Sequence, residues 1–142
     1  MNSQQIQAFF PNTPLFYGVF SCDTIPNTTD KCGMIINTDP KDNTGEHWVA
    51  LYQNGKGSSE YFDSFGLPPI IPSILNHLTQ TTPNGCKYNS LTLQHPSAST
   101  CGLYCISFIR HKLLLNGSYE SFLSYFCTNT IHNESIITRL FE

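Results

Sequence analysis

Two strand-like runs joined by an Asn-Gly turn most constrain the fold of this chain. Residues 47–52 form an apolar run, residues 58–63 form a second run that contains Tyr61 and Phe62, and an Asn-Gly dipeptide lies between them. Asn-Gly between two such runs is the strongest short-range signal for a β-hairpin. A turn centred on Gly55 makes His47 and Asp63 face each other, with Cβ atoms roughly 4.5–5.5 Å apart. At that distance a carboxylate can accept the imidazole N–H.

A cysteine begins a second informative segment, the apolar, helix-like run over residues 101–115. The run predicts a central buried helix whose cationic end complements the helix dipole. A thiol at a helix N-terminus is favoured as the thiolate, because backbone N–H groups and the dipole stabilise negative charge there. Cys101 is therefore a candidate nucleophile, and Cys105, one turn further on, is expected in the core. Taken alone, Cys101 is more simply a buried apolar residue, since free cysteines are often buried.

A nucleophilic thiol needs a base, and His47 is the best placed of the five histidines. It begins a strand, which can hold its ring rigidly, and Asp63 can orient it. Glu46 is adjacent in sequence and points to the opposite face of the strand, so it is a poorer orienting partner. The simpler alternatives are an aromatic-rich edge strand for His47-Trp48 and a turn residue that closes the hairpin for Asp63.

Length and charge exclude several classes of protein. At 142 residues the chain is long enough for one domain and too short for two ordinary ones, so a single domain over 1–142 is expected. The net charge is −3 and the seven basic residues are scattered, which argues against intrinsic nucleic-acid binding. No apolar run has membrane-spanning length, and the first residues do not resemble a signal peptide. An intracellular protein without membrane association is expected.

The six cysteines favour reduced thiols over disulfides, because no secretion signal accompanies them. The sequence has no Cys-x-x-Cys pair, and Cys101 with Cys105 lacks a second ligand pair at metal spacing, so no metal site is predicted. Cys22, Cys32 and Cys127 are expected to be small apolar fillers.

The remaining segments predict further helices and strands. They are a helix over 3–10, strands over 15–20 and 33–37, a helix over 72–80, a strand over 89–94, a short helix from Ser118, and a last helix capped by Asn133 and ending at Phe141. No repeat, low-complexity tract or linker separates them.

Four motifs follow one another along the chain, and their order indicates a protein family. They are Gly45-Glu-His-Trp48, Tyr61-Phe-Asp-Ser-Phe-Gly66, Gln94, and Cys101-Gly-Leu-Tyr-Cys105. With His, acid, Gln and Cys in this order, the chain resembles the adenovirus-type cysteine endopeptidases, relatives of the SUMO and ubiquitin-like-protein proteases. The spacing from Gln94 to Cys101 is similar to that of the adenoviral branch. The resemblance implies an α+β cysteine-protease fold, in which a small mixed or antiparallel sheet packs on a central helix that carries the nucleophile.

The resemblance also implies a role for each matching position. Cys101 is expected to be the nucleophile, His47 the general base and acid, and Asp63 the orienting carboxylate. Gln94 is expected to donate to the oxyanion from its side chain, with the backbone N–H of Cys101 as the second donor. Three further residues are expected to line the site: Trp48, Glu46 and His95. For His95, a solvated loop position is the simpler alternative.

An enzyme of this type is expected to cleave viral structural precursor polypeptides during capsid maturation, at sites with glycine or other small residues. It would act as a monomer in the interior of the infected cell and in the virion. Adenoviral enzymes are stimulated by a viral peptide and by DNA, but this chain lacks a basic surface, so no cofactor is expected to be required. An activating peptide that pairs with Cys86 is the alternative. Two other functions stay open: a processing protease for ubiquitin-like modifiers, and a catalytically inactive relative that binds processed proteins.

Overall fold

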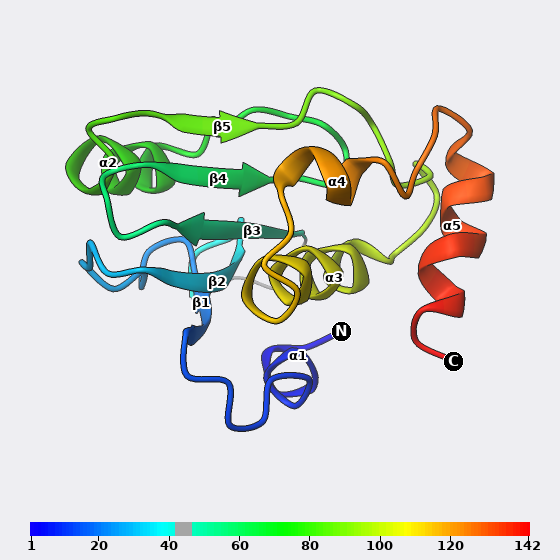
Figure 1. Cartoon of the computed structure of the whole chain (residues 1–142), viewed down its shortest axis with the longest axis horizontal. Coiled ribbons are helices and arrows are strands. Elements are labelled where there is room, and N and C mark those ends of the chain that lie inside the picture. Colours follow the sequence, from blue (N-terminus) through cyan, green and yellow to red (C-terminus); the bar gives the residue numbers. More distant parts are fainter. Residues whose placement is uncertain (42–46) are drawn as a thin grey trace.

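The computed structural model describes residues 1–41 and 47–142, which form a five-stranded mixed sheet with helices around it (Figure 1). The strands lie in the order β1-β2-β3-β4-β5. Their bounds are Phe16–Ser21 (β1), Cys32–Asn37 (β2), Trp48–Gln53 (β3), Ser59–Phe62 (β4) and Cys86–Tyr88 (β5). The outer pairs β1/β2 and β4/β5 are parallel, whereas β3 is antiparallel to both of its neighbours. The predicted small mixed sheet is confirmed.

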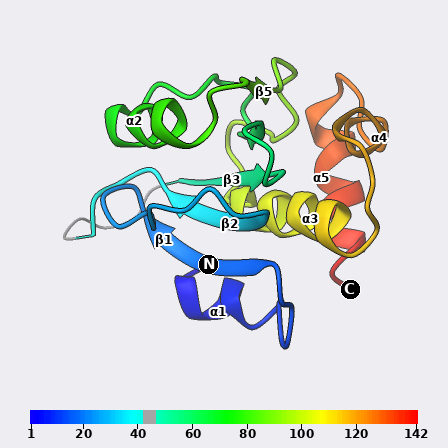
Figure 2. The same ribbon diagram turned by 60° about the vertical axis from the view of Figure 1, so that its left-hand side comes forward.

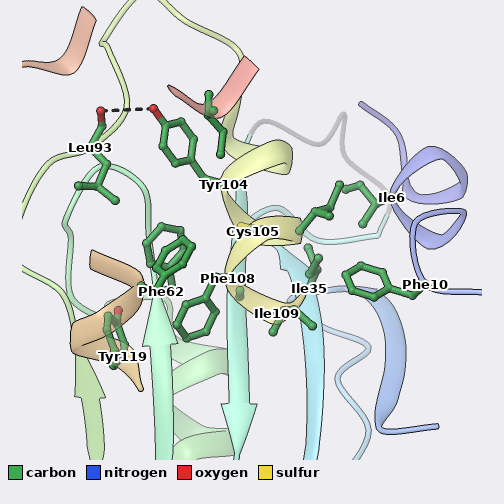
Figure 3. Packing of buried hydrophobic residues seen from close by; sticks show 14 of the residues in the cluster. Ile6, Phe10, Ile35, Phe62, Leu93, Tyr104, Cys105, Phe108, Ile109 and Tyr119 are labelled. Atoms are coloured by element: carbon green, nitrogen blue, oxygen red, sulfur yellow. Dashed lines mark hydrogen bonds between the residues drawn. The ribbon is translucent and has the colours of Figure 1, made fainter. Parts of the chain in front are cut away.

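Helices cover both faces of this sheet (Figures 1 and 2). Their bounds are Ser3–Gln7 (α1), Pro72–Thr81 (α2), Cys101–Leu113 (α3), Tyr119–Leu123 (α4) and Thr130–Arg139 (α5). Strand side chains alternate between faces, so each face carries its own apolar cluster. One cluster joins Ile35, Ala50 and Phe62 to α3 (Figure 3), and the other joins Met34, Ile36, Val49, Leu51 and Tyr61 to α2. Among the described residues, no helix has both the length and the apolar character needed to cross a membrane.

The helix α3 is the central buried helix that the sequence predicts. It packs against β2 and β3, and its residue Cys105 is fully buried. The ring of Phe108 stacks on that of Phe62 in β4, with centroids 5.1 Å apart. Because so much of α3 is fixed in the core, its first residue, Cys101, has a defined position near the start of the central strand β3.

The predicted hairpin is confirmed, but its register is shifted. Ala50 faces Phe62, which centres the loop one residue later than predicted, on Lys56. Shifting the centre by one residue changes each partner by two, so residues expected on one face stay on that face. His47 and Asp63 are therefore diagonal neighbours beyond the last paired residues rather than directly opposed.

The shift arises because the loop is longer than a two-residue Asn-Gly turn. The backbone N–H of Asn54 donates to the carbonyl of Ser58 at 3.0 Å. The Asn54 side-chain oxygen accepts from the N–H groups of Lys56 and Ser58 at 2.7 and 3.1 Å. Gly55 and Gly57 both adopt positive φ, at 77° and 87°, which other residues rarely do. The whole segment folds around the Asn54 side chain.

The prediction of a strand over 89–94 is wrong. The strand β5 ends at Tyr88, and residues 89–94 do not continue it. The Nδ2 of Asn89 donates to the carbonyls of Asp63 and Leu91 at 2.9 and 3.1 Å, so a side chain takes up these backbone acceptors. The N–H groups of Leu93 and Gln94 both donate to the carbonyl of Ser64, at 2.8 and 3.0 Å. Two successive N–H groups converging on one oxygen do not form a ladder.

The prediction that Asn133 caps the last helix is also wrong. The cap is Asn129, whose side chain accepts from the His132 N–H at 3.1 Å. Asn133 lies inside α5 and is fully buried. Its side chain accepts from the Cys127 N–H at 2.9 Å and donates to the carbonyls of Cys127 and Leu93 at 2.7 and 3.1 Å. The asparagine therefore joins the helix to two loops instead of starting it.

The other predicted elements are confirmed within a few residues at their ends. They are the helix predicted over 3–10, the strands over 15–20 and 33–37, the helix over 72–80, the helix over 101–115, and the short helix capped by Ser118. The largest difference among them is at the N-terminus, where α1 ends at Gln7.

Candidate active site

Cys101 is the first residue of α3, and the helix leaves its N-terminal N–H groups without a side-chain cap. Thr100 occupies the cap position, but its hydroxyl donates to Oε1 of Glu134 in α5 at 2.7 Å. A capping oxygen would otherwise occupy the N–H groups of the first turn. These groups therefore remain available to a negative charge at Cys101.

The surroundings of Cys101 favour its thiolate. Burial alone would raise the pKa of this thiol, since the charged form loses its hydration. Interactions with the His47 side chain and with the backbone N–H groups of Trp48 and Gly102 favour the charged form, and together they lower the pKa of Cys101 below its ordinary value. Most buried cysteines behave in the opposite way, as Cys105 does, where burial raises the pKa of the thiol.

His47 directly precedes β3, and its ring interacts with both Asp63 and Cys101. Its Nε2 lies 2.9 Å from Oδ1 of Asp63, which leaves Nδ1 for Cys101. Burial disfavours the charged ring, but the hydrogen bonds and charges of Asp63 and Cys101 outweigh it and raise the pKa of His47 to about 9. The ring also stacks on Phe65, with centroids 5.1 Å apart. His47 is therefore held as an imidazolium beside the sulfur at neutral pH.

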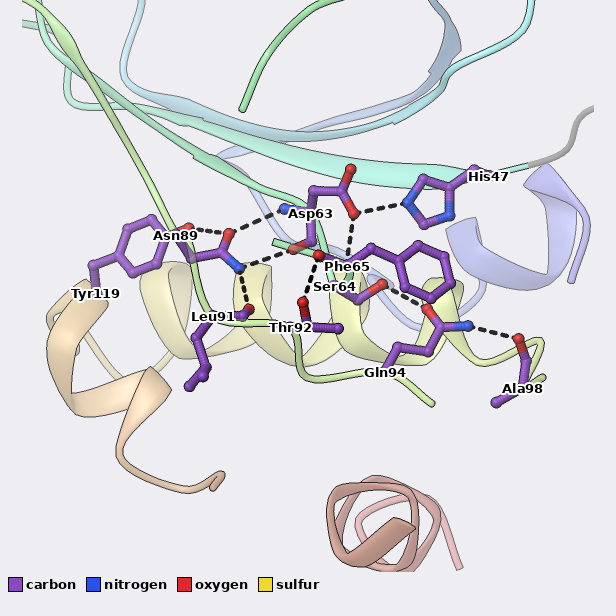
Figure 4. A network of polar contacts seen from close by, with 10 residues as sticks. All are labelled: His47, Asp63, Ser64, Phe65, Asn89, Leu91, Thr92, Gln94, Ala98 and Tyr119. Atoms are coloured by element: carbon purple, nitrogen blue, oxygen red, sulfur yellow. Dashed lines mark hydrogen bonds and ion pairs between the residues drawn. The ribbon is translucent and has the colours of Figure 1, made fainter. Parts of the chain in front are cut away.

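A buried asparagine holds Asp63 in place, as Figure 4 shows. The Asn89 side chain accepts from the Asp63 N–H at 3.3 Å and donates to the Asp63 carbonyl at 2.9 Å. The hydroxyl of Tyr119 donates to the Asn89 side-chain oxygen at 2.9 Å. The Oδ1 atom of Asp63 also accepts the Phe65 N–H at 2.8 Å, so both its backbone and its carboxylate are fixed.

Gln94 is buried beside the nucleophile and its amide is held from both ends (Figure 4). Its Oε1 accepts from the Ser64 hydroxyl at 2.6 Å, and its Nε2 donates to the Ala98 carbonyl at 2.8 Å. A cavity of about 290 Å³ opens at this point. Its lining residues are Met1, His47, Trp48, Phe65, Gln94, Ala98, Ser99, Cys101 and Gly102.

The structure thus brings together Cys101, His47, Asp63 and Gln94, with Trp48 in the cavity wall. Trp48 donates its indole N–H to the Met1 carbonyl at 3.1 Å. His95 does not line this cavity. Its Nδ1 lies 2.8 Å from the hydroxyl of Ser97, a contact within the loop before α3. Glu46 lies outside the described residues.

No metal-binding cluster accompanies this set. Over residues 1–41 and 47–142, no three His, Cys, Asp or Glu side chains gather closely enough to hold an ion. The six cysteines are all free thiols. Cys22 and Cys32 are buried as predicted, but Cys127 is exposed, so the prediction that it is an apolar filler is wrong.

Comparison with known proteins gives viral proteases among the curated relatives. No family model matches the chain. It is 32% identical over 108 residues to the SUMO-1 cysteine protease S273R of African swine fever virus, a match that covers 65% of this chain and 37% of that protein. It is 28% identical over 110 residues to the protease of bovine adenovirus 7, covering 66% of this chain and 54% of that protein. The chain is a relative of the adenain-like viral cysteine proteases.

The fold of this adenain-like chain is confirmed by a solved structure. The crystal structure of the African swine fever virus pS273R protease matches it with a TM-score of 0.52 and 32% identity, over 70% of this chain and 40% of that one. The α+β fold is therefore shared. The chain spans little more than a third of the length of the S273R protein, and 54% of that of the bovine adenovirus protease.

Sequence reasoning missed three residues that support the site of this adenain-like chain: Ser64, Asn89 and Glu134. Ser64 lies in the motif around Asp63, so its position beside the acid was visible in the sequence. Asn89 and Glu134 carried no such signal, because their partners are distant along the chain. Glu134 accepts the hydroxyls of Thr100 and Tyr104 at 2.7 and 2.8 Å.

Proposed function

We propose that this chain is a cysteine endopeptidase that cleaves viral structural precursor polypeptides. The observation that carries the proposal is the contact sequence from Asp63 through His47 to Cys101, at the uncapped N-terminus of α3 and beside Gln94. This geometry supports a nucleophile, a base that also serves as acid, an orienting carboxylate and an oxyanion donor.

The proposed reaction begins with the thiolate of Cys101 attacking the carbonyl carbon of the scissile peptide bond. The carbonyl oxygen becomes an oxyanion, which the backbone N–H of Cys101 and an N–H of Gln94 stabilise. The imidazolium of His47 gives its proton to the leaving nitrogen as the C–N bond breaks, and a thioester remains. Neutral His47 then takes a proton from water, the resulting hydroxide attacks the thioester, and the product carboxylic acid leaves as the thiolate and imidazolium return.

A narrow cavity supports a preference for glycine or other small residues next to the scissile bond. A Cβ atom added to Gly102 would lie 3.0 Å from the Met1 sulfur and 3.6 Å from Cδ1 of Trp48. Space beside the nucleophile is thus limited by the indole and by the first residue. A substrate with small side chains fits this space most readily.

Hydrolysis of Gly-Gly-containing peptides tests the proposal. Wild-type protein should cleave such peptides. With Cys101→Ala, the peptides should be hydrolysed only at the uncatalysed rate that is measured in buffer without protein. Cys127→Ala is the matched control, because Cys127 is an exposed thiol, and it should cleave at the wild-type rate. Equal rates for wild type and Cys101→Ala would remove the proposal and revive an inactive, binding role.

A processing protease for ubiquitin-like modifiers is the second candidate, and the name of the S273R relative, SUMO-1 cysteine protease, favours it. The same four residues would serve that reaction. Cleavage of ubiquitin-like fusion proteins and of short peptides with the same cleavage sequence separates the two functions. The precursor-cleaving function predicts little preference for the folded modifier, and a strong preference for the fusion would replace it by the second candidate.

We also propose that the enzyme acts as a monomer inside infected cells and in virions, and that it needs no cofactor. The relatives are viral proteases, which supports the location. Burial raises the pKa of the Cys86 thiol, which disfavours the thiolate that a disulfide-forming activating peptide would need. Peptide hydrolysis by the purified chain should therefore be insensitive to added DNA, and size-exclusion chromatography should give the mass of one copy.

A further inference from the structure

The Gln94 amide has two orientations that differ by a half-turn and exchange its oxygen with its nitrogen. Only one of them supports the reaction, because an oxyanion needs an N–H and is repelled by a carbonyl oxygen. Gln94 is 1% exposed, so water competes little with its protein partners for the amide. The neighbouring protein groups must make the selection.

Two neighbours select the productive orientation. The Ser64 hydroxyl donates to Oε1 at 2.6 Å, and the Ala98 carbonyl accepts one N–H of Nε2 at 2.8 Å. A flipped amide would set Oε1 of Gln94 against the carbonyl oxygen of Ala98. These two oxygens are both acceptors, and neither would then have a donor. In the observed orientation the second N–H of Nε2 remains for the oxyanion.

We propose that Ser64 is a positioning residue that fixes the Gln94 amide for catalysis. The inference rests on the proposed endopeptidase function. Ser64 is fully buried, and its carbonyl also accepts the Gln94 N–H at 3.0 Å, so one residue holds both the backbone and the side chain of Gln94. Ser64 directly follows Asp63, which orients His47. The Asp63-Ser64 dipeptide thereby positions both the base and the oxyanion donor.

Kinetics of Ser64→Ala test this role. Without the hydroxyl, Oε1 loses its donor and the unproductive orientation becomes populated, so kcat for peptide hydrolysis should fall about tenfold while KM changes little. Alkylation of Cys101 by iodoacetamide should keep its wild-type rate, because alkylation forms no oxyanion. Thr92→Val is the matched control: it removes an exposed hydroxyl that donates to the Phe65 carbonyl at 3.0 Å, and it should leave kcat unchanged.

A double-mutant cycle separates positioning from a general structural role. Gln94→Ala should lower kcat about a hundredfold, and Ser64→Ala added to Gln94→Ala should lower it no further. If Ser64→Ala does not fold, Ser64→Cys keeps the volume with a weaker donor and should show the same pattern with a smaller loss. Three results would each overturn the inference. They are a wild-type kcat in Ser64→Ala, a further loss of kcat when Ser64→Ala is added to Gln94→Ala, and slower alkylation of Cys101 in Ser64→Ala than in the wild type. A wild-type protein without Cys101-dependent cleavage would instead overturn the proposed function, and the inference with it.

Discussion

The His47 ring and the Asp63 carboxylate meet just beyond the paired parts of their strands, with Nε2 and Oδ1 2.9 Å apart. His47 directly precedes β3, and Asp63 directly follows β4. The sheet therefore fixes where the two backbones run. Only 5% of the Asp63 side chain and 18% of the His47 side chain are exposed, so water competes little for this contact.

Asp63→Asn should shift the pH dependence of peptide hydrolysis. Asparagine keeps an oxygen that can accept N–H groups, but it removes the charge that helps to hold His47 protonated. The pKa of His47 should then fall from about 9, so that the imidazolium is lost at a lower pH as the pH rises. We expect the largest loss of kcat between the lowered pKa and about pH 9, where the variant has lost the imidazolium that the wild type still carries; each unit by which the pKa falls lowers the ratio of charged to neutral ring tenfold at a given pH. A pH–rate profile measures the move of its basic limb to lower pH.

The control for this variant is Asp23→Asn. Asp23 is exposed and its carboxylate accepts the Lys41 N–H at 2.9 Å, away from His47. Its profile should match that of the wild type. A basic limb that stays in place in Asp63→Asn would show that the carboxylate does not set the pKa of His47.

Iodoacetamide should label Cys101 before the other cysteines of the folded chain. Hydrogen bonds from His47 and the backbone lower the pKa of Cys101, whereas burial raises the pKa of Cys105 and raises that of Cys32 to about 12. Mass spectrometry of digested protein after labelling at neutral pH measures the order. Exposed Cys127 should react more slowly than Cys101, and Cys32 and Cys105 only after unfolding. Labelling of Cys105 as fast as Cys101 would contradict this order.

The sequence was most informative where a local pattern decides the geometry. Alternation in the hairpin put His47 and Asp63 on one face, and this conclusion survived the shift of register because faces repeat every two residues. The run after Cys101 predicted the helix and its start at the nucleophile correctly. In each case the deciding signal lies within a few residues of the feature it predicts.

The sequence was least informative where one side chain binds distant backbone. Asn89 contacts Asp63, far away along the chain, and the alternating pattern around it was therefore mistaken for a strand. Asn133 was mistaken for a helix cap for a related reason: asparagine favours caps, but here it bridges buried loops. Such contacts depend on tertiary packing, which no local pattern contains.

Asn89→Ala should destabilise the fold by about 2–4 kcal/mol, because it leaves buried backbone groups of Asp63 and the carbonyl of Leu91 without their partner. Urea denaturation followed by fluorescence measures the change. Exposed Asn27 supplies the control, and Asn27→Ala should change the free energy of unfolding by less than about 0.5 kcal/mol. If Asn89→Ala changed the free energy of unfolding as little, water would have to replace the hydrogen bonds of the Asn89 side chain.

Glu134→Gln should weaken the loop that carries the nucleophile. Three donors point at this carboxylate: the hydroxyls of Thr100 and Tyr104 and, at 3.2 Å, the backbone N–H of His95. Burial and Glu134 raise the pKa of the Tyr104 hydroxyl, so this group remains a donor. Glutamine offers one acceptor oxygen in place of two, and its NH₂ group must face a donor.

We therefore expect Glu134→Gln to lower the free energy of unfolding by about 1–3 kcal/mol and to lower kcat as well. The loop from residue 95 to residue 100 connects Gln94 to Cys101, so a change in its path moves the oxyanion donor relative to the sulfur. Urea denaturation and peptide hydrolysis measure the two effects, with exposed Glu142→Gln as the control for the loss of one charge. Lower stability with unchanged kcat would mean that Glu134 supports the fold alone, because the loop then keeps its path without the carboxylate.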